Sequence, residues 1–197
     1  MEREPLQAID YNAEIEQNVS RETFQQLQKF KELILKWNKA QNLTSRSSVS
    51  MGHLDELIAD SLILDQLIPK NCAVLDIGSG GGFPGLVLAI LGHRIDLVER
   101  NFKKTVFLTE AKRQLDLPLC KVLNTDIRDL DQVNKYQYIC SKAMATSEFI
   151  VNATAKNIVR DSKYLLLKSP DQMSEIEQLK KLYRFTLQQV ENKYKTN

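Results

Sequence analysis

The sequence predicts an α/β fold in which a mostly parallel, doubly wound sheet follows an N-terminal cap of helices. Three observations support this prediction. Residues 20–40 and 54–67 repeat apolar side chains at three- and four-residue steps, which is the period of an amphipathic helix. After Cys72 the pattern changes to short apolar or β-branched runs that alternate with helical stretches. Five glycines lie within residues 78–85, at the first predicted turn from a strand to a helix.

The predicted elements follow one another along the chain without a linker. Pro69 ends the second cap helix, and no internal repeat or low-complexity tract interrupts the sequence. We therefore expect a single domain over 1–197, with a helical cap over 1–70 and a ligand-binding core over 71–197. Strands are predicted over 73–77, 94–98, 119–123, 136–140, 163–167 and 184–190, and core helices over 84–91, 102–116, 145–158 and 171–182.

Composition and charge are those of an ordinary globular protein. The chain has 197 residues, of which 43% are hydrophobic and 26% are charged, with a net charge of +2. No apolar run is long enough to span a membrane and the acidic start does not resemble a signal peptide, so we expect a cytoplasmic protein without a membrane partner. The three cysteines are far apart and lack metal-ligand spacing, so we expect free thiols and no metal site. Residues 1–30 carry six Asp or Glu against three Lys or Arg, which leaves a charge of +5 on the remainder. That part of the chain is suited to an anionic partner.

The glycine turn is suited to a cofactor that approaches bare backbone. It follows the apolar strand 73–77, near whose end lies Asp76. This carboxylate would repel a phosphate-bearing nucleotide, whereas S-adenosylmethionine (SAM) carries an ammonium and a sulfonium that it would attract. Asp76 therefore favours SAM over NAD. Two alternatives stay open. One is a dinucleotide site, because Gly80, Gly82 and Gly85 satisfy its spacing, and the other is a glycine-rich turn that binds no ligand.

Acidic residues also follow the next two predicted strands. In an open parallel sheet, ligands bind beyond the carboxyl ends of the strands. Glu99 ends the second strand and is placed like an acid that binds both ribose hydroxyls, with a solvated surface acid as the alternative. After the third strand, Asp126 could accept the adenine amino proton while Ile127 covers the ring, with a helix N-cap as the alternative for Asp126. Three acids at successive strand ends match adenosyl recognition without a phosphate site.

Four segments in a fixed order resemble the RsmG family, also called GidB. They are WNKAQNLT at 37–44, DSL at 60–62, VLDIGSGGGFPG at 74–85 and KKTVFL at 103–108, and the resemblance covers residues 20 to about 170. It implies the fold of a class I SAM-dependent methyltransferase, which is Rossmann-like. It also implies SAM as the cofactor, and N7 of a guanine in small-subunit (16S) ribosomal RNA as the methyl acceptor.

The resemblance implies roles for residues at matching positions. Gly78 and Phe83 match positions that contact SAM, and Ile127 and Arg128 match a pair near the adenine. Lys142 stands where the family usually has an arginine. With the acids and glycines discussed above, the expected cofactor-binding residues are Asp76, Gly78, Ser79, Gly80, Gly82, Phe83, Glu99, Asp126, Ile127, Arg128 and Lys142.

The implied reaction depends on alignment rather than on acid–base chemistry. N7 of guanine has an available lone pair and no proton, so a general base is unnecessary, and we name only Lys142 and Lys168 as positioning candidates. Lys103, Lys142 and Lys168 are the expected RNA contacts, and Phe83 or Met144 could pack against the target base. The expected partner is small-subunit ribosomal RNA in a ribosomal particle, and we expect the protein to be a monomer.

The sequence departs from the family at several positions. Glu56 and Leu57 stand where the family has an Arg-His pair, and Asp126 stands where an arginine is common. The usual Leu-Lys-Gly reads Leu-Lys-Ser-Pro over 167–170, and the closing Arg-rich strand is shortened. Lost cations weaken contacts with RNA. A second hypothesis is therefore a catalytically weak relative that binds SAM and RNA without methylating the RNA.

Overall fold

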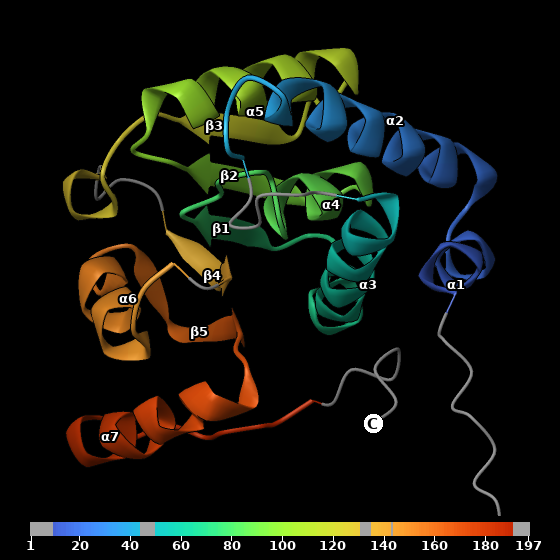
Figure 1. The fold of residues 1–197 in the computed structure, drawn as a ribbon. Helices are drawn as coiled ribbons and strands as arrows, with labels where there is room; N and C mark the ends of the chain where they lie inside the picture. Colours follow the sequence, from blue (N-terminus) through green and yellow to red (C-terminus); the bar gives the residue numbers. More distant parts are fainter. Residues whose placement is uncertain (1–9, 44–49, 131–134, 143, 191–197) are drawn as a thin grey trace, which may run out of the picture.

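The structure is a computed structural model that describes residues 10–43, 50–130, 135–142 and 144–190. In this part of the chain one sheet is flanked by helices (Figure 1). The strands are β1 (Ala73–Ile77), β2 (Arg94–Val98), β3 (Cys120–Leu123), β4 (Tyr136–Lys142) and β5 (Ile158–Leu167). The helices are α1 (Tyr11–Asn18), α2 (Arg21–Asn38), α3 (Met51–Leu67), α4 (Gly85–Ile90), α5 (Phe102–Gln114), α6 (Ser147–Thr154) and α7 (Ser174–Leu182), with short 3-10 turns η1 (Ile127–Asp129) and η2 (Pro170–Met173).

The sheet is parallel throughout, in the order β3-β2-β1-β4-β5. The chain moves outward from β1 through β2 to β3, and then crosses to the other side of β1 for β4 and β5 (Figure 1). In such a sheet the ligand crevice lies beyond the carboxyl ends of the strands where this order reverses. The loops after β1 and β4 meet at that point, because Ile77 pairs with Ser141.

The two faces of the sheet pack against different helices. Val74 of β1 belongs to a large core cluster with residues of α2, α3, α4 and α5. Leu75 and Ile77 belong to a smaller cluster that includes Ile150 of α6. Since side chains alternate along a strand, Asp76 shares the face of Val74. A carboxyl group is thus placed on the more heavily covered side of the sheet.

Helix α2 connects the cap to the sheet. It begins after Ser20, whose hydroxyl accepts a hydrogen bond from the backbone N–H of Thr23 at 3.2 Å. On its inner face the ring of Phe30 lies 5.2 Å from the ring of Phe83, which follows the glycine turn. Cap and sheet therefore share one core cluster. That shared core is the physical reason to expect them to unfold as one domain, which stays a prediction.

A buried ion pair joins α2 to α3. Lys31 and Asp55 are 1% and 5% exposed, and the Lys31 Nζ lies 2.5 Å from the Asp55 Oδ1. Lys31 also donates to the Oδ1 of Asn12 in α1 at 3.1 Å. One ammonium thereby links the first three helices. Neither α1 nor this pair was predicted, because no apolar period marks them.

Most of the predicted elements are confirmed. The five strands from 73 to 167 and the helices of cap and core are present, although β5 begins at Ile158 rather than at 163. The predicted strand over 184–190 is wrong, since residues 183–190 form no strand. Its apolar residues Phe185, Leu187 and Val190 are 41–45% exposed. Alternation alone does not make a strand where no neighbouring strand pairs with the segment.

Other features limit the kinds of site that the fold can hold. Cys120 and Cys140 are buried, Cys72 is partly buried, and none of them is bonded to another cysteine. Burial raises the pKa of Cys120 to about 12, so its thiol stays protonated at neutral pH. None of the described helices combines the length and the apolar composition needed to cross a membrane.

Candidate cofactor site

The glycine turn lies between β1 and α4, at the edge of the sheet where the strand order reverses. The backbone N–H groups of Gly78 and Ser79 both donate to the carbonyl oxygen of Val98, at 2.9 and 3.2 Å, which ties the turn to the end of β2. Gly78 has a φ of +68°, and a Cβ there would lie 2.2 Å from the Cγ of Met144. Only glycine meets both conditions, so the turn brings bare backbone against the segment that follows β4.

Asp76 lies beneath this turn and is completely buried. A Cβ on Gly85 would lie 2.4 Å from its Oδ2, so the carboxyl group packs against the start of α4. Neither oxygen has a partner in hydrogen-bonding geometry within the described part of the chain. Burial raises the pKa of Asp76 to about 7, although the Ser79 hydroxyl, the Gly85 backbone and the charge of Lys142 act in the opposite direction.

This placement changes the argument that Asp76 selects the cofactor. That argument needs a fixed negative charge facing the ligand, whereas the structure has a buried carboxyl group that is partly protonated near neutral pH. The physical reason is that β1 turns this side chain toward α4 instead of the crevice. Asp76 by itself therefore does not decide between SAM and NAD.

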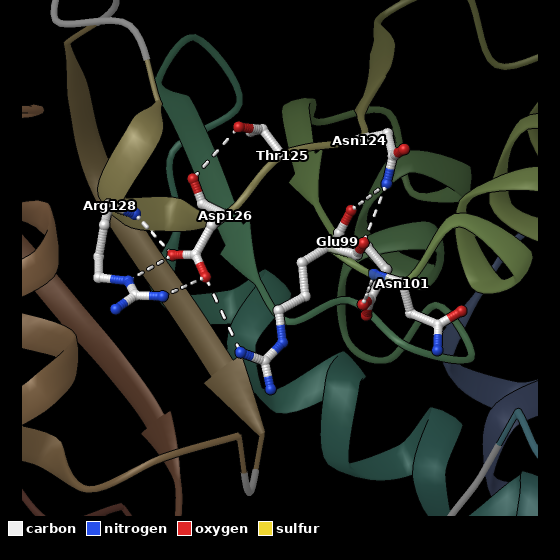
Figure 2. A network of polar contacts seen from close by, with 7 residues as sticks. Glu99, Asn101, Asn124, Thr125, Asp126 and Arg128 are labelled. Carbon is white, nitrogen blue, oxygen red and sulfur yellow. Dashed lines mark hydrogen bonds and ion pairs between the residues drawn. The ribbon is translucent and has the colours of Figure 1, made fainter.

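Glu99 is held at the edge of the crevice by backbone donors. Its Oε2 accepts from the N–H of Gly80 at 3.0 Å, and its Oε1 accepts from the N–H of Asn101 at 2.7 Å. The residue is 7% exposed, so the alternative of a solvated surface acid is wrong. Figure 2 shows Glu99 beside Asn101 and Asn124. Each carboxylate oxygen keeps a second lone pair, so the group can still accept from ligand hydroxyls.

Asn124 has a role that we did not predict. Its Nδ2 donates to the carbonyl oxygen of Glu99 at 3.0 Å (Figure 2) and also to the Oγ1 of Thr105 at 3.0 Å. It therefore fastens the end of β3 to the end of β2 and to α5. A short polar residue directly after a strand is the signal that could have indicated this role.

Asp126 begins the turn η1 after β3. Its Oδ1 accepts from the backbone N–H of Arg128 at 3.0 Å, which confirms the N-cap alternative. The guanidinium of Arg128 also donates to both carboxylate oxygens at 2.9 Å (Figure 2). The Nη1 of Arg100 lies 3.8 Å from the Oδ2 of Asp126. These hydrogen bonds hold the pKa of Asp126 well below its usual range. Ile127 is buried beside this pair, at 5% exposed. A contact of the three residues with adenine stays a prediction.

The expected basic and aromatic residues have different surroundings. Lys103 is exposed in the first turn of α5, and Lys142 is half-buried at the end of β4. The Lys168 side chain is 7% exposed, and its Nζ donates to the Glu175 carboxylate at 2.8 Å and to the Ala145 carbonyl oxygen at 3.0 Å. In this arrangement Lys168 is a structural tether and is not presented to RNA.

The expectation that Phe83 or Met144 could pack against the target base fails for the Phe83 ring and stays a prediction for Met144. The ring of Phe83 packs on Phe30 in the core, so only its backbone faces the glycine turn. Met144 is half-buried and lies against Gly78. It therefore lies directly beside the turn.

The comparisons with known proteins decide the family. The model of the family described as GidB, rRNA small subunit methyltransferase G, matches residues 23–196. The chain belongs to this family. It is 36% identical over 174 residues to ribosomal RNA small subunit methyltransferase G of Rickettsia felis, which covers 85% of each chain. It is 33% identical over 187 residues to the protein of the same name from Orientia tsutsugamushi, covering 93% of this chain and 92% of the relative. The predicted resemblance to the RsmG or GidB family is thus confirmed.

Solved structures confirm the predicted fold of this family member. A precorrin-6y C5,15-methyltransferase from Geobacter metallireducens aligns with a TM-score of 0.55 and 17% identity over 72% of this chain and 73% of that one. Coclaurine N-methyltransferase, solved with N-methylheliamine and SAH, aligns with a TM-score of 0.53 and 16% identity over 79% of this chain and 54% of that one. Both are methyltransferases by name, and at these identities the likeness shows the fold alone. The class I SAM-dependent methyltransferase architecture follows.

Proposed function

We propose that the protein methylates N7 of a guanine in small-subunit ribosomal RNA, with SAM as the methyl donor. Membership of the rRNA small subunit methyltransferase G family makes the chain an rRNA methyltransferase. The observation that carries the assignment to this site is the Glu99 carboxylate. It is fixed by two backbone N–H groups beside the glycine turn, with lone pairs left for a ribose.

The residues around the turn fit the parts of an adenosyl cofactor. Glu99 would accept from the ribose hydroxyls, since both of its oxygens are held at the edge of the crevice. The Gly78–Gly82 backbone would lie along the methionine part, with Met144 as an apolar wall. Asp126, Ile127 and Arg128 would lie at the adenine. Asp76 would act from beneath the turn, where a cation favours its charged form.

The chemistry asks the protein for alignment and for the exclusion of water. SAM supplies an electrophilic methyl group on a sulfonium when it is bound. N7 of guanine has no proton to lose, so no residue of the chain has to act as a general base. Lys142 lies at the end of β4, next to the loop that follows β1, and would be the residue that positions the acceptor.

Lys168 would contribute to positioning from a distance. The Glu175 carboxylate that accepts from Lys168 also accepts from the backbone N–H of Ser147 at 2.9 Å and from its hydroxyl at 3.1 Å. Together with the bond from Lys168 to Ala145, these contacts fix the segment that follows Met144. We propose that Lys168 orders the wall of the crevice and does not itself bind phosphate.

The test is methyl transfer from labelled SAM to small ribosomal subunits that lack the modification. We expect label in the RNA, and borohydride reduction followed by aniline cleavage should locate it at 7-methylguanine. Comparing intact subunits with naked RNA tests the further proposal that a ribosomal particle is the substrate, and light scattering tests the proposed monomer. Normal SAM binding without transfer to either form of RNA would remove the catalytic claim.

A second function stays in view because Lys142 stands where the family usually has an arginine. A lysine offers a point charge in place of a planar guanidinium with two parallel donors. If the protein binds SAM and RNA with little transfer, Lys142→Arg separates the alternatives. A sharp rise in transfer indicates a weakened enzyme, whereas no rise indicates a binding module.

A further inference from the structure

A groove outside the cofactor turn lies between α2 and α5. Its volume is about 490 Å³, and its walls include Trp37, Phe102 and Val106, with Lys36 and Glu110 on the rim. The two helices lie side by side on the outer edge of the molecule (Figure 1). Thr105 also lines the groove, and its hydroxyl accepts from Asn124 beside Glu99. The groove is large enough for a single nucleotide or a similar planar group.

The apolar walls of this groove are unusually open to solvent. Phe102 is 69% exposed and Val106 is 39% exposed, although they occupy the first two turns of α5. Trp37 is fixed, because its indole packs on the edge of Phe107 at 5.7 Å with an interplanar angle of 62°. A rigid indole opposite an exposed phenyl ring makes a site at which a flat, unsaturated group can stack.

The charge around the groove favours an anion. Glu110 is the acid of α5, against four lysines or arginines on the same helix. Its carboxylate is already bound, since Arg113 donates to it at 2.9 and 2.7 Å and Gln114 donates at 2.6 Å. Lys36 is exposed on the rim, and Lys103, also exposed, follows Phe102 in the first turn of α5. A ligand that combines a planar group with negative charge suits this arrangement.

The groove leads to the cofactor turn. The N-terminal half of α2 is bound to the end of α5, since Gln26 donates to the Leu115 carbonyl oxygen at 3.0 Å. The groove runs along α5 from Phe102 to Gln114, and the C-terminal turn of α2 contributes Lys36 and Trp37. The Lys104 Nζ would lie 4.0 Å from a Cβ on Gly80, and Phe102 is three residues beyond Glu99 in the chain. An RNA strand that reaches the glycine turn would therefore pass the groove.

We propose that the groove between α2 and α5 binds an unpaired base of the RNA substrate, close in sequence to the target guanine. The base stacks on Phe102 and against Trp37, while Lys36 and Lys103 contact the adjoining phosphates. Base stacking on an aromatic side chain is tolerant of sequence, so the groove would position the strand without selecting a base. The inference rests on the proposed function, because it takes RNA to be the substrate.

Trp37 is the one tryptophan of the chain, so its fluorescence reports directly on the groove. The probe is a fluorescein-labelled single-stranded RNA of about 12 nucleotides, with binding followed by anisotropy and an unlabelled copy used for Trp37 emission. We expect the RNA to quench Trp37, and Phe102→Ala to weaken RNA binding by about 5- to 150-fold, as expected for the loss of one stacked base. Phe102→Tyr keeps an aromatic ring and should bind RNA like the unmodified protein, whereas Phe102→Leu should be weakened like Phe102→Ala.

Leu119→Ala is the matched control, because Leu119 is an apolar residue that is 55% exposed and lies away from the groove. It should bind RNA like the unmodified protein, and all variants should bind SAM equally in calorimetry. RNA binding without a change in Trp37 emission, or unchanged binding by Phe102→Ala, would overturn the inference. If the groove results hold but no methyl transfer is found, the proposed function fails and the groove assignment stands. If methyl transfer is found but Phe102→Ala binds RNA unchanged, the groove assignment fails and the proposed function stands.

Discussion

Replacing Asp76 by asparagine should change how the stability of the protein depends on pH. The carboxyl group is completely buried, and burial raises its pKa to about 7 from a value of 3.8 in the absence of the fold. Asparagine has nearly the same shape and carries no charge at any pH. The substitution therefore removes the titration while it leaves the packing against Gly85 close to the original.

The sign and size of the effect follow from linkage. Because the folded pKa is raised, the folded state binds this proton more tightly than the unfolded state does. The contribution of the protonated Asp76 carboxyl to the unfolding free energy is fully present below about pH 4 and is lost as the pH rises through about 7. A difference of three pH units corresponds to roughly 4 kcal/mol of unfolding free energy. That amount is a large part of the total stability of a domain.

The assay is urea unfolding of both proteins at a series of pH values between about 3 and about 8, a range that spans both values of the Asp76 pKa. The difference in unfolding free energy between Asp76→Asn and the unmodified protein should move in favour of the variant as the pH rises. Asp65 and Glu175 have lowered pKa values and act in the opposite direction, but they are present in both proteins and cancel in the difference. A difference that is flat across this range would refute the reasoning.

The titration of Asp76 can also be measured through the binding of SAM. A bound cation favours the charged form, so SAM binding near neutral pH should release a proton from Asp76. Calorimetry in two buffers with different ionisation enthalpies measures this release. Asp76→Asn should abolish it, whereas Asp126, whose pKa is held low by Arg128, contributes nothing at neutral pH.

Three further substitutions test other contacts of the fold and the site. Gly78→Ala introduces a Cβ at a φ of +68° and 2.2 Å from Met144, so thermal unfolding should show a loss of at least roughly 1–2 kcal/mol. Glu99→Gln places an amide donor against a backbone N–H, so calorimetry should show SAM affinity weakened by about 10- to 100-fold and urea unfolding should show a loss of about 1–3 kcal/mol. Lys31→Met leaves Asp55 buried without a partner and should cost about 3–5 kcal/mol in urea unfolding, while the added exchange Asp55→Leu should recover most of it.

Much of the candidate site follows from local sequence patterns. The glycine turn and the acid at the end of β2 could be placed in advance, because strand–turn–helix patterns and the parallel sheet bring strand ends to one edge. The family motifs were equally visible. What could not be placed was the hydrogen bonding of each acid. For Asp126 the sequence favoured neither an N-cap nor a contact with adenine. The backbone donors that hold Glu99 come from two separate loops, which no local pattern brings together.

The sequence by itself determined the alternation of strands and helices from residue 73 to 167, the position of the turn and the family. Tertiary structure alone decided which side chains are available. Asp76 faces α4 instead of the crevice, Lys168 is bound to Glu175, and Phe102 is left exposed beside Trp37. Local patterns depend on the chain's own periodicity, whereas burial and charge depend on which distant segments pack together. A residue's pKa and exposure are therefore properties of its neighbours in space.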